Sequence, residues 1–332
     1  MHKIFSAVAL VTAMVVAGVP TGAQAAPVTV VNGADWRDTA GAPIHAHGGG
    51  VIKVDQYYYW FGENRNADDS FRYVSAYRST DLKTWEFRNH VLRESSAPEL
   101  GYAKIERPKV IYNAATKQFV MWMHKEYGSN YSEARAAVAV SSTVDGNYRY
   151  LGSFRPQGHM SRDITAFVDT QGTGYMISAA DDNADLHIYR LTSDYTNVAA
   201  RVYRWDGSHR EAPALFKRNG VYFMVTSGAT WWNPNQQRYA TATNIAGPWS
   251  AWRAVGDSTG YRSQTAFVLP IQGTQAPSYL YMGDRWAGAW NRPVNESRYV
   301  WLPLQFPSST SLAMDGRERI SIDVATGVVK GA

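Results

Sequence analysis

Glu211-Ala-Pro-Ala-Leu-Phe-Lys217 leads through a turn at Asn219-Gly220 into Val221-Tyr-Phe-Met-Val225, and this stretch decides the fold. A carboxylate stands at the head of a short apolar run, and a second run of aromatic and β-branched residues follows the turn. Both runs have the length and composition of β-strands. The stretch therefore predicts an antiparallel strand pair with a polar residue at its start.

The same unit occurs four more times in the chain. The other copies begin at His47, Glu106, Asp163 and Gln264, so the five lead residues are 59, 57, 48 and 53 positions apart. Repeats of this length, each with about four strands, are typical of β-propeller blades. We therefore expect an all-β fold, a five-bladed β-propeller, over residues 26–332 as a single catalytic domain. A two-sheet sandwich is the alternative, but its strands should not repeat one unit with a polar residue at its head.

Composition excludes several classes of protein. Apolar residues make up 45% and charged residues 18% of the 332 residues, which is inconsistent with intrinsic disorder. The absence of Cys excludes disulfides, thiolate zinc sites, iron–sulfur clusters and a Cys nucleophile. The net charge is +5 and the basic residues are scattered, so we expect no nucleic-acid partner. The 12 Trp and 21 Tyr suit a β-rich fold and a sugar-binding cleft.

The N-terminus has the pattern of a secretory signal peptide. Met1-His2-Lys3 precedes an apolar run from Ile4 to Val19, and Ala23-Gln24-Ala25 fits a cleavage site. The run is shorter than the ~20 residues that span a membrane, which disfavours a membrane anchor. We expect residues 1–25 to be removed, leaving a secreted, extracellular monomer without membrane association.

The lead residues also indicate chemistry. In a propeller, the first strand of each blade lies beside the central axis, so all five lead residues would face one pit. Three of them are carboxylates, namely Glu106, Asp163 and Glu211, and clustered acids raise each other's pKa. Inverting glycoside hydrolysis uses a proton donor and a base ~6.5–9.5 Å apart. Each acid alone could simply bind loop backbone, but the periodic set favours a catalytic site.

At this level the chain resembles glycoside hydrolase family 43, and within it the exo-β-1,3-galactanase group. The motifs that carry the resemblance extend over nearly all of the expected domain: His45-Ala-His-Gly-Gly-Gly50, Tyr59-Trp-Phe-Gly-Glu63, Glu106-Arg-Pro-Lys109, Arg162-Asp163, Arg210-Glu-Ala-Pro-Ala214, Thr226-Ser-Gly-Ala-Thr-Trp-Trp-Asn-Pro-Asn235, Ser263-Gln264-Thr-Ala-Phe267, Tyr281-Met-Gly-Asp-Arg-Trp286 and Tyr299-Val-Trp-Leu-Pro-Leu304. The resemblance implies a five-bladed propeller with an inverting carboxylate site.

The resemblance also implies roles for single residues. Glu211 matches the general acid of the family, and Asp163 matches the carboxylate that tunes this acid and holds the sugar. Most of the family has a general-base Asp in the first blade, but here His47-Gly48 occupies that place. The galactanase group shares this departure, and Gln264 matches the Gln implicated there in place of the base. Whether Gln264 acts as an imidic-acid tautomer, positions water or only binds sugar stays open.

Further residues are expected to bind the sugar. Glu63 and Glu106 match acids that contact the terminal galactose, and Tyr131 and Asp182 are additional contacts. Of Trp231 and Trp232, one should form a stacking platform and the other should pack between blades; we assign Trp232 to substrate binding.

No cofactor and no required metal are expected. Some members of the family that the chain resembles hold a cation in the central channel, so whether a structural cation is bound stays open. His45, His47 and His124 do not have zinc-site spacing, and the carboxylates do not have the spacing of a calcium loop.

The expected activity is release of galactose from β-1,3-galactan, the backbone of arabinogalactan, by an exo-acting inverting enzyme. The alternatives are a β-xylosidase or an α-L-arabinofuranosidase, which the missing first-blade Asp disfavours, and a non-catalytic sugar-binding propeller. After Phe306, the run Arg319-Ile-Ser-Ile-Asp-Val324 is expected to close the propeller by adding a strand.

Overall fold

The computed structural model describes residues 26–128 and 130–332. The expected signal peptide, residues 1–25, lies outside the described residues. The described part of the chain contains 23 strands, five short 3₁₀-helices and no α-helix, so the all-β prediction is confirmed. None of its helices is long and apolar enough to cross a membrane.

Five sheets contain four antiparallel strands each, paired in chain order. The first three are β2 (His47–Val54), β3 (Tyr57–Arg65), β4 (Phe71–Ser79) and β5 (Glu86–Arg93); β6 (Ala103–Asn113), β7 (Gln118–Tyr127), β8 (Arg135–Ser141) and β9 (Arg149–Phe154); and β10 (Ile164–Val168), β11 (Gly174–Ala180), β12 (Asp185–Leu191) and β13 (Val198–Trp205). The last two are β14 (Arg210–Arg218), β15 (Val221–Gly228), β16 (Gln237–Ala242) and β17 (Arg253–Val255); and β18 (Gln264–Ile271), β19 (Ser278–Arg285), β20 (Arg298–Gln305) and β21 (Ala313–Met314).

A sixth sheet joins the two ends of the described chain. It has three strands in the order β1 (Val28–Val31), β22 (Arg319–Asp323) and β23 (Val328–Gly331). The run 319–324 thus forms a strand as expected, but its partners are β1 and β23. The two-residue strand β21 completes the fifth sheet instead.

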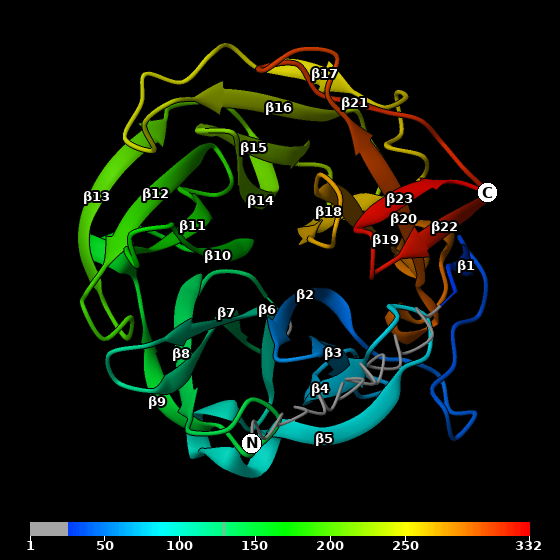
Figure 1. Ribbon diagram of the computed structural model, residues 1–332. Coiled ribbons are helices and arrows are strands. Elements are labelled where there is room, and N and C mark those ends of the chain that lie inside the picture. Colours follow the sequence, from blue (N-terminus) through cyan, green and yellow to red (C-terminus); the bar gives the residue numbers. More distant parts are fainter. Residues whose placement is uncertain (1–25, 129) are drawn as a thin grey trace, which may run out of the picture.

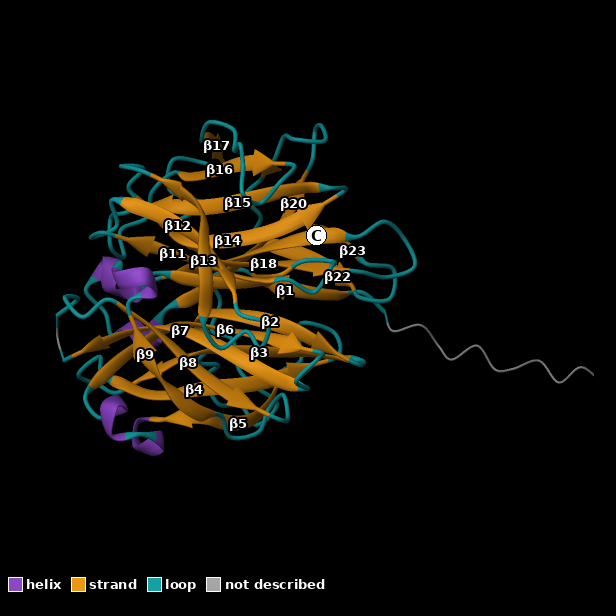
Figure 2. Ribbon diagram, turned by 90° about the vertical axis from the view of Figure 1, so that its left-hand side faces the viewer, coloured by secondary structure: helices purple, strands orange, loops and turns teal. Residues whose placement is uncertain are grey.

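The five four-stranded sheets are arranged around a common centre (Figure 1). Their first strands β2, β6, β10, β14 and β18 lie innermost, each contacts the next, and β18 contacts β2. The short helices, purple in Figure 2, lie toward one end of the molecule. They comprise Glu94–Ser96, Pro98–Leu100, Pro156–Gly158, Ala287–Trp290 and Val294–Glu296.

The hydrophobic core is divided into five clusters, and each lies between two neighbouring four-stranded sheets. The cluster between the first and fifth of these sheets also contains side chains of the sixth sheet. Between the first and fifth sheets, for example, the buried rings of Trp60 and Trp301 have centroids 5.2 Å apart. Burying one large apolar side chain contributes roughly 1.5–3 kcal/mol, so these five seams hold the sheets together.

The lead strands share a local irregularity. In β2, β6 and β14 the pairing shifts register just after the lead residue, and the next residue has positive φ: Gly48 (61°), Arg107 (53°) and Ala212 (54°). Such β-bulges bend a strand and re-aim its side chains, and they are frequent beside active sites.

Each bulge presents a backbone N–H to a carboxylate of the preceding sheet, and we call these three hydrogen bonds the bulge contacts. They join Gly48 N to Asp284 Oδ2 (2.9 Å), Arg107 N to Glu63 Oε1 (2.9 Å) and Ala212 N to Asp163 Oδ2 (3.0 Å). The acids at the centre therefore also connect neighbouring sheets.

Candidate active site

A pocket of about 180 Å³ opens where four of the five lead residues meet. Its walls include all eight residues that the sequence analysis assigned to the site: Glu63, Glu106, Tyr131, Asp163, Asp182, Glu211, Trp232 and Gln264. The fifth lead residue, His47, does not line this pocket, contrary to expectation. It is buried behind it, with Nδ1 3.0 Å from Asp284 Oδ1 and its ring stacked on Tyr299.

Glu211, the second residue of β14, is buried at the pocket wall. Its Oε1 accepts a hydrogen bond from Gln264 Nε2 (2.9 Å) and its Oε2 accepts one from Asn183 Nδ2 (3.1 Å). Burial, and then the negative charge of Asp163, raise the pKa of Glu211 to about 8. The carboxyl therefore holds its proton at neutral pH, as a general acid must.

Asp163 precedes β10 and has partners on both carboxylate oxygens. Its Oδ1 lies 2.9 Å from Arg107 Nε, and its Oδ2 accepts the N–H of Ala212 in a bulge contact. Arg107, which the sequence analysis did not assign, lines the same pocket and is buried. The sequence does contain a signal for Arg107, because this residue directly follows the lead residue Glu106. A cation among clustered carboxylates relieves their mutual repulsion, so a basic residue at this position is expected to belong to the site.

Gln264, the first residue of β18, uses its full hydrogen-bonding capacity within the protein. Its Oε1 accepts from Arg107 Nη2 (2.5 Å) and Trp286 Nε1 (2.7 Å). Its Nε2 donates to Glu211 Oε1 and to Ser227 Oγ (3.0 Å). Arg and Trp can only donate, so the side-chain amide cannot be reversed end for end.

A second group of charges forms the wall around Glu106. Arg65 Nη2 contacts Glu106 Oε1 (2.9 Å) and Glu63 Oε2 (2.5 Å), and Tyr131 donates its O–H to Glu106 Oε1 (2.7 Å). Although burial opposes it, Arg65, His124 and Tyr131 hold the pKa of Glu106 well below its usual range. Burial raises the pKa of Glu63, even though Arg65 beside it acts in the opposite direction.

His124 is enclosed by carboxylates. Its Nδ1 lies 3.0 Å from Glu106 Oε2, and its Nε2 lies 2.8 Å from Glu126 Oε1. Burial favours the neutral ring, but the two carboxylates raise the pKa of His124 to about 9. Glu106, His124 and Asp163 place one potential ligand atom each within 4.8 Å of one another. With a cationic His124 and with Arg107 on Asp163, this group does not fit a metal ion.

The loop 181–184 between β11 and β12 closes one side of the pocket. It places Asp182 and Asn183 at the wall, and Arg162 Nη2 donates to Asp182 Oδ1 (2.8 Å) and to the carbonyl of Tyr131 (2.7 Å). The sequence analysis assigned Asp182 to the site but missed Asn183. The only feature of the sequence that could have indicated Asn183 is its position next to Asp182.

Two adjacent tryptophans follow β15. The Trp231 ring is the exposed one, with 68% of its surface accessible, and it meets Tyr131 edge to face at 5.6 Å. Trp232 is half-buried against Gly288, where an added Cβ would lie 2.1 Å from its ring. Both line the pocket, and Trp231 offers the freer indole face. The division of roles expected from the sequence, which left Trp231 to pack between blades, is therefore wrong for Trp231.

One small polar pocket thus combines a buried carboxyl that stays protonated, further carboxylates on its walls and an exposed indole face, and these features define a site of the glycoside hydrolase class. The chain belongs to glycosyl hydrolases family 43, whose family model matches residues 46–266.

Solved structures of high similarity agree with this membership. An exo-β-1,3-galactanase from Clostridium thermocellum has 52% identity and a TM-score of 0.90, over 92% of this chain and 68% of that one. A variant of an exo-β-1,3-galactanase from Phanerochaete chrysosporium, solved with β-1,3-galactotriose, has 38% identity and a TM-score of 0.86, over 92% of this chain and 70% of that one. A search of curated proteins gave no match.

Proposed function

We propose that this protein is an exo-β-1,3-galactanase that releases galactose from the β-1,3-galactan backbone of arabinogalactan by inversion. The observation that carries the proposal is Glu211: a buried carboxyl with a pKa of about 8 stands in a pocket of about 180 Å³. The similarity to solved exo-β-1,3-galactanases over 92% of the chain supports the choice of linkage.

In this mechanism, Glu211 protonates the oxygen of the leaving sugar while water attacks the anomeric carbon from the opposite face. The proton that this water loses passes to solvent, and Glu211 takes a proton back from solvent after the sugars have left. The negative charge of Asp163 keeps the proton on Glu211 until the substrate arrives, and the ion pair with Arg107 holds the Asp163 side chain in place. Glu63, Glu106 and Tyr131 hold the terminal galactose, together with Asp182. Trp231 and Trp232 offer indole faces to the sugar at the rim.

Gln264 acts by orientation. The two donors on its Oε1 stabilise the amide tautomer, because an imidic acid would place a hydroxyl hydrogen where Arg107 and Trp286 already donate. Its N–H instead fixes the position of Glu211 Oε1. Gln264 is therefore a positioning residue for the acid, rather than a base.

Hydrolysis of defined glycans tests this function. The protein should release galactose from β-1,3-galactan oligosaccharides, and NMR at early times should show α-galactose, the inverted anomer. Release of xylose or arabinose from matched aryl glycosides at higher kcat/KM would favour the other family 43 activities. Binding of galactan without release would show a sugar-binding protein, and retained β-galactose would overturn the inverting mechanism.

We further propose that the five four-stranded sheets are the blades of a closed five-bladed β-propeller, secreted as a monomer after removal of residues 1–25. The ring of contacts from β2 through β18 and back supports closure. N-terminal sequencing of exported protein should begin near residue 26, and light scattering should give the mass of one chain. A retained N-terminus or a dimer mass would contradict these two proposals.

A further inference from the structure

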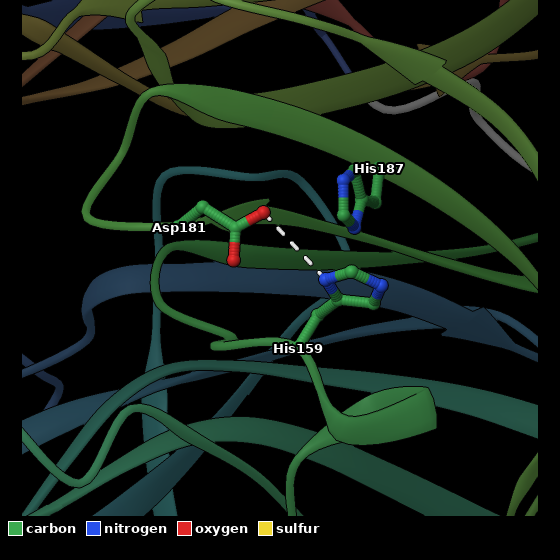
Figure 3. Close-up of side chains that lie close together, drawn as sticks. All are labelled: His159, Asp181 and His187. Atoms are coloured by element: carbon green, nitrogen blue, oxygen red, sulfur yellow. Dashed lines mark ion pairs between the residues drawn. The ribbon is translucent and has the colours of Figure 1, made fainter.

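A second cluster of potential ligand atoms lies outside the pocket, beside the third sheet. His159 follows the short helix Pro156–Gly158, Asp181 begins the loop 181–184, and His187 belongs to β12. One ligand atom from each lies within 4.8 Å of the others. Figure 3 shows the three side chains converging from separate segments, and we call them the His–Asp cluster.

His187 is held with a free lone pair aimed into this cluster. Its side chain is 0% exposed, and its Nδ1 lies 2.8 Å from the Tyr189 hydroxyl. Tyr189 donates its hydrogen to the carbonyl of Pro156 (3.4 Å), so His187 Nδ1 carries the proton and donates to the Tyr189 oxygen. The Nε2 of His187 then has a lone pair and no hydrogen-bond partner among the described residues. Buried polar atoms are almost always paired in folded proteins, and this lone pair is therefore available to an ion that enters the cluster.

Two carboxylates accompany the rings at distances that are too long for hydrogen bonds but suited to a bridging ion. Asp181 Oδ2 lies 3.5 Å from His159 Nδ1, and Asp185 Oδ2 lies 3.6 Å from His187 Nε2. Zinc bonds to imidazole nitrogen and carboxylate oxygen are ~2.0–2.2 Å long, and both ligand types suit Zn²⁺. A single ion between the rings would thus reach several of these atoms after small side-chain shifts.

Arg201 is the group that opposes an ion. Its Nη1 lies 2.8 Å from His159 Nε2 and donates to it, which places the ring proton of His159 on Nδ1. Binding through Nδ1 requires the other tautomer, so Arg201 must turn away. The side chain of Arg201 is half-exposed and has no other hydrogen bond in the described part of the chain, which leaves it free to move into solvent.

We propose that His159, Asp181 and His187, with Asp185 as a further carboxylate, form a site for one divalent transition-metal ion of the Zn²⁺ type. The ion would fix Asp181 and hence the loop 181–184, in which Asp181, Asp182 and Asn183 all have positive φ (49°, 57° and 62°). Asn183 donates to Glu211 Oε2, so the site would stabilise one wall of the pocket. Only this last effect rests on the proposed function; ion binding does not.

Calorimetric titration of the untagged, chelator-treated protein with ZnCl₂ tests the site, and CoCl₂ provides visible absorption bands as a second readout. We expect one ion per chain. Asp181→Asn and His159→Gln should each weaken binding at least tenfold. Tyr189→Phe, which removes only the group that orients His187, should weaken it ~10–100-fold. Arg201→Gln should tighten it, because a cation and a competing donor are removed.

Matched controls are Asp206→Asn, on the exposed surface, and His90→Gln, whose ring stacks on Tyr73 in the first sheet. Both should leave the affinity unchanged, and thermal unfolding checks that every variant is folded. Absence of binding at millimolar Zn²⁺ overturns the proposal. Binding that survives Asp181→Asn and His159→Gln, or that galactose displaces, places the ion elsewhere and overturns it as well.

Discussion

At the scale of single residues, the pH dependence of the reaction follows from Glu211. Its pKa is raised to about 8, mainly by burial and then by Asp163, so the carboxyl is protonated below this pH and ionised above it. A general acid works only in the protonated form, and kcat/KM should therefore fall as the pH rises through about 8.

This fall of kcat/KM is the alkaline limb of the pH profile, and replacing Asp163 should move it to lower pH. Asp163→Asn removes the negative charge that disfavours ionisation of Glu211 and frees Arg107 to stabilise the ionised form. Profiles of kcat/KM against pH for both proteins measure the shift. Asp206→Asn is the control and should leave the limb in place, because Asp206 is exposed, pairs with Arg204 and does not line the pocket. An unchanged or higher limb in Asp163→Asn would assign Asp163 to sugar binding alone.

Replacing Gln264 by a carboxylate should move the limb the other way. Gln264→Glu puts an acid where an N–H now donates to Glu211 Oε1 at 2.9 Å, and two adjacent carboxyls raise each other's pKa. Ser227→Ala removes the other acceptor of the amide without adding charge, and it should keep the limb near its original pH. Higher turnover in Gln264→Glu, with a new acidic limb and an unshifted alkaline one, would instead indicate that the native site lacks a base.

Glu211→Gln tests the acid itself, because it keeps size and hydrogen bonding but removes the proton. General-acid help contributes ~10²–10⁴-fold, so kcat on galactan oligosaccharides should fall by at least this range. An aryl galactoside with a good leaving group needs little protonation and should lose less. Equal losses on the two substrates, compared side by side, would assign Glu211 to binding.

The sequence could predict the residues at repeat positions but not those that reach the pocket by other routes. Asp163, Glu211 and Gln264 stand within one residue of the start of an innermost strand, which the spacing of the units indicates. Glu106 occupies the fourth position of β6, because this strand begins earlier than predicted. Arg107, Asn183 and Trp231 were missed because a bulge, a loop of left-handed residues and a turn aim them, and none of these has a periodic signal. His47 has the right position in the repeat, but its ring turns to Asp284 and away from the cavity.

At the scale of elements, the bulges determine where the acids point. Both the backbone conformation and the space around position 48 require a glycine. Its φ is 61°, which side chains disfavour, and an added Cβ would lie 2.3 Å from Glu63 Oε1. That oxygen accepts the bulge contact from Arg107 N, so a Cβ at Gly48 would disturb two sheets together.

Gly48→Ala should therefore destabilise the fold by ~1–3 kcal/mol beyond the backbone strain alone, because Glu63 must give up its buried hydrogen bond. Gly41→Ala is the matched control, since Gly41 also has positive φ (83°) but an added Cβ would meet no atom within 4 Å. The free energy of unfolding in urea, measured for both variants, isolates the clash. Equal losses would show that Glu63 can move aside without cost.

At the scale of the whole molecule, the sixth sheet ties the first described strand to the last two. The repeat predicts the five four-stranded sheets, because each unit supplies its own strands in order. It could not predict the partner of the run 319–324, since a strand pattern indicates conformation but not pairing. In the structure this run pairs antiparallel with β1, which lies at the other end of the described chain.

Asn32, directly after β1, extends this link to the fifth sheet. Its side chain exchanges two hydrogen bonds of 2.7 Å with the backbone N–H and carbonyl of Trp301, and it donates to the carbonyl of Arg317 (2.9 Å). Asn32→Ala should cost ~1–3 kcal/mol, because the backbone of Trp301 loses its partner. The melting temperature should fall by several degrees, whereas Asn147→Ala, which removes one exposed hydrogen bond, should leave it unchanged. If Asn32→Ala had the same melting temperature as the parent protein, the hydrogen bonds of Asn32 would not contribute to the stability of the fold.

The bulge contacts have a consequence for how such chains diverge. Glu63, Asp163 and Asp284 each accept a backbone hydrogen bond across a seam between sheets, so selection for a folded protein preserves them even where selection for catalysis has ended. Glu211 has no bulge contact. A descendant that has become a lectin or a regulatory pseudoenzyme would therefore keep most of the acidic pit, and a change at Glu211 would be the earliest mark of its history.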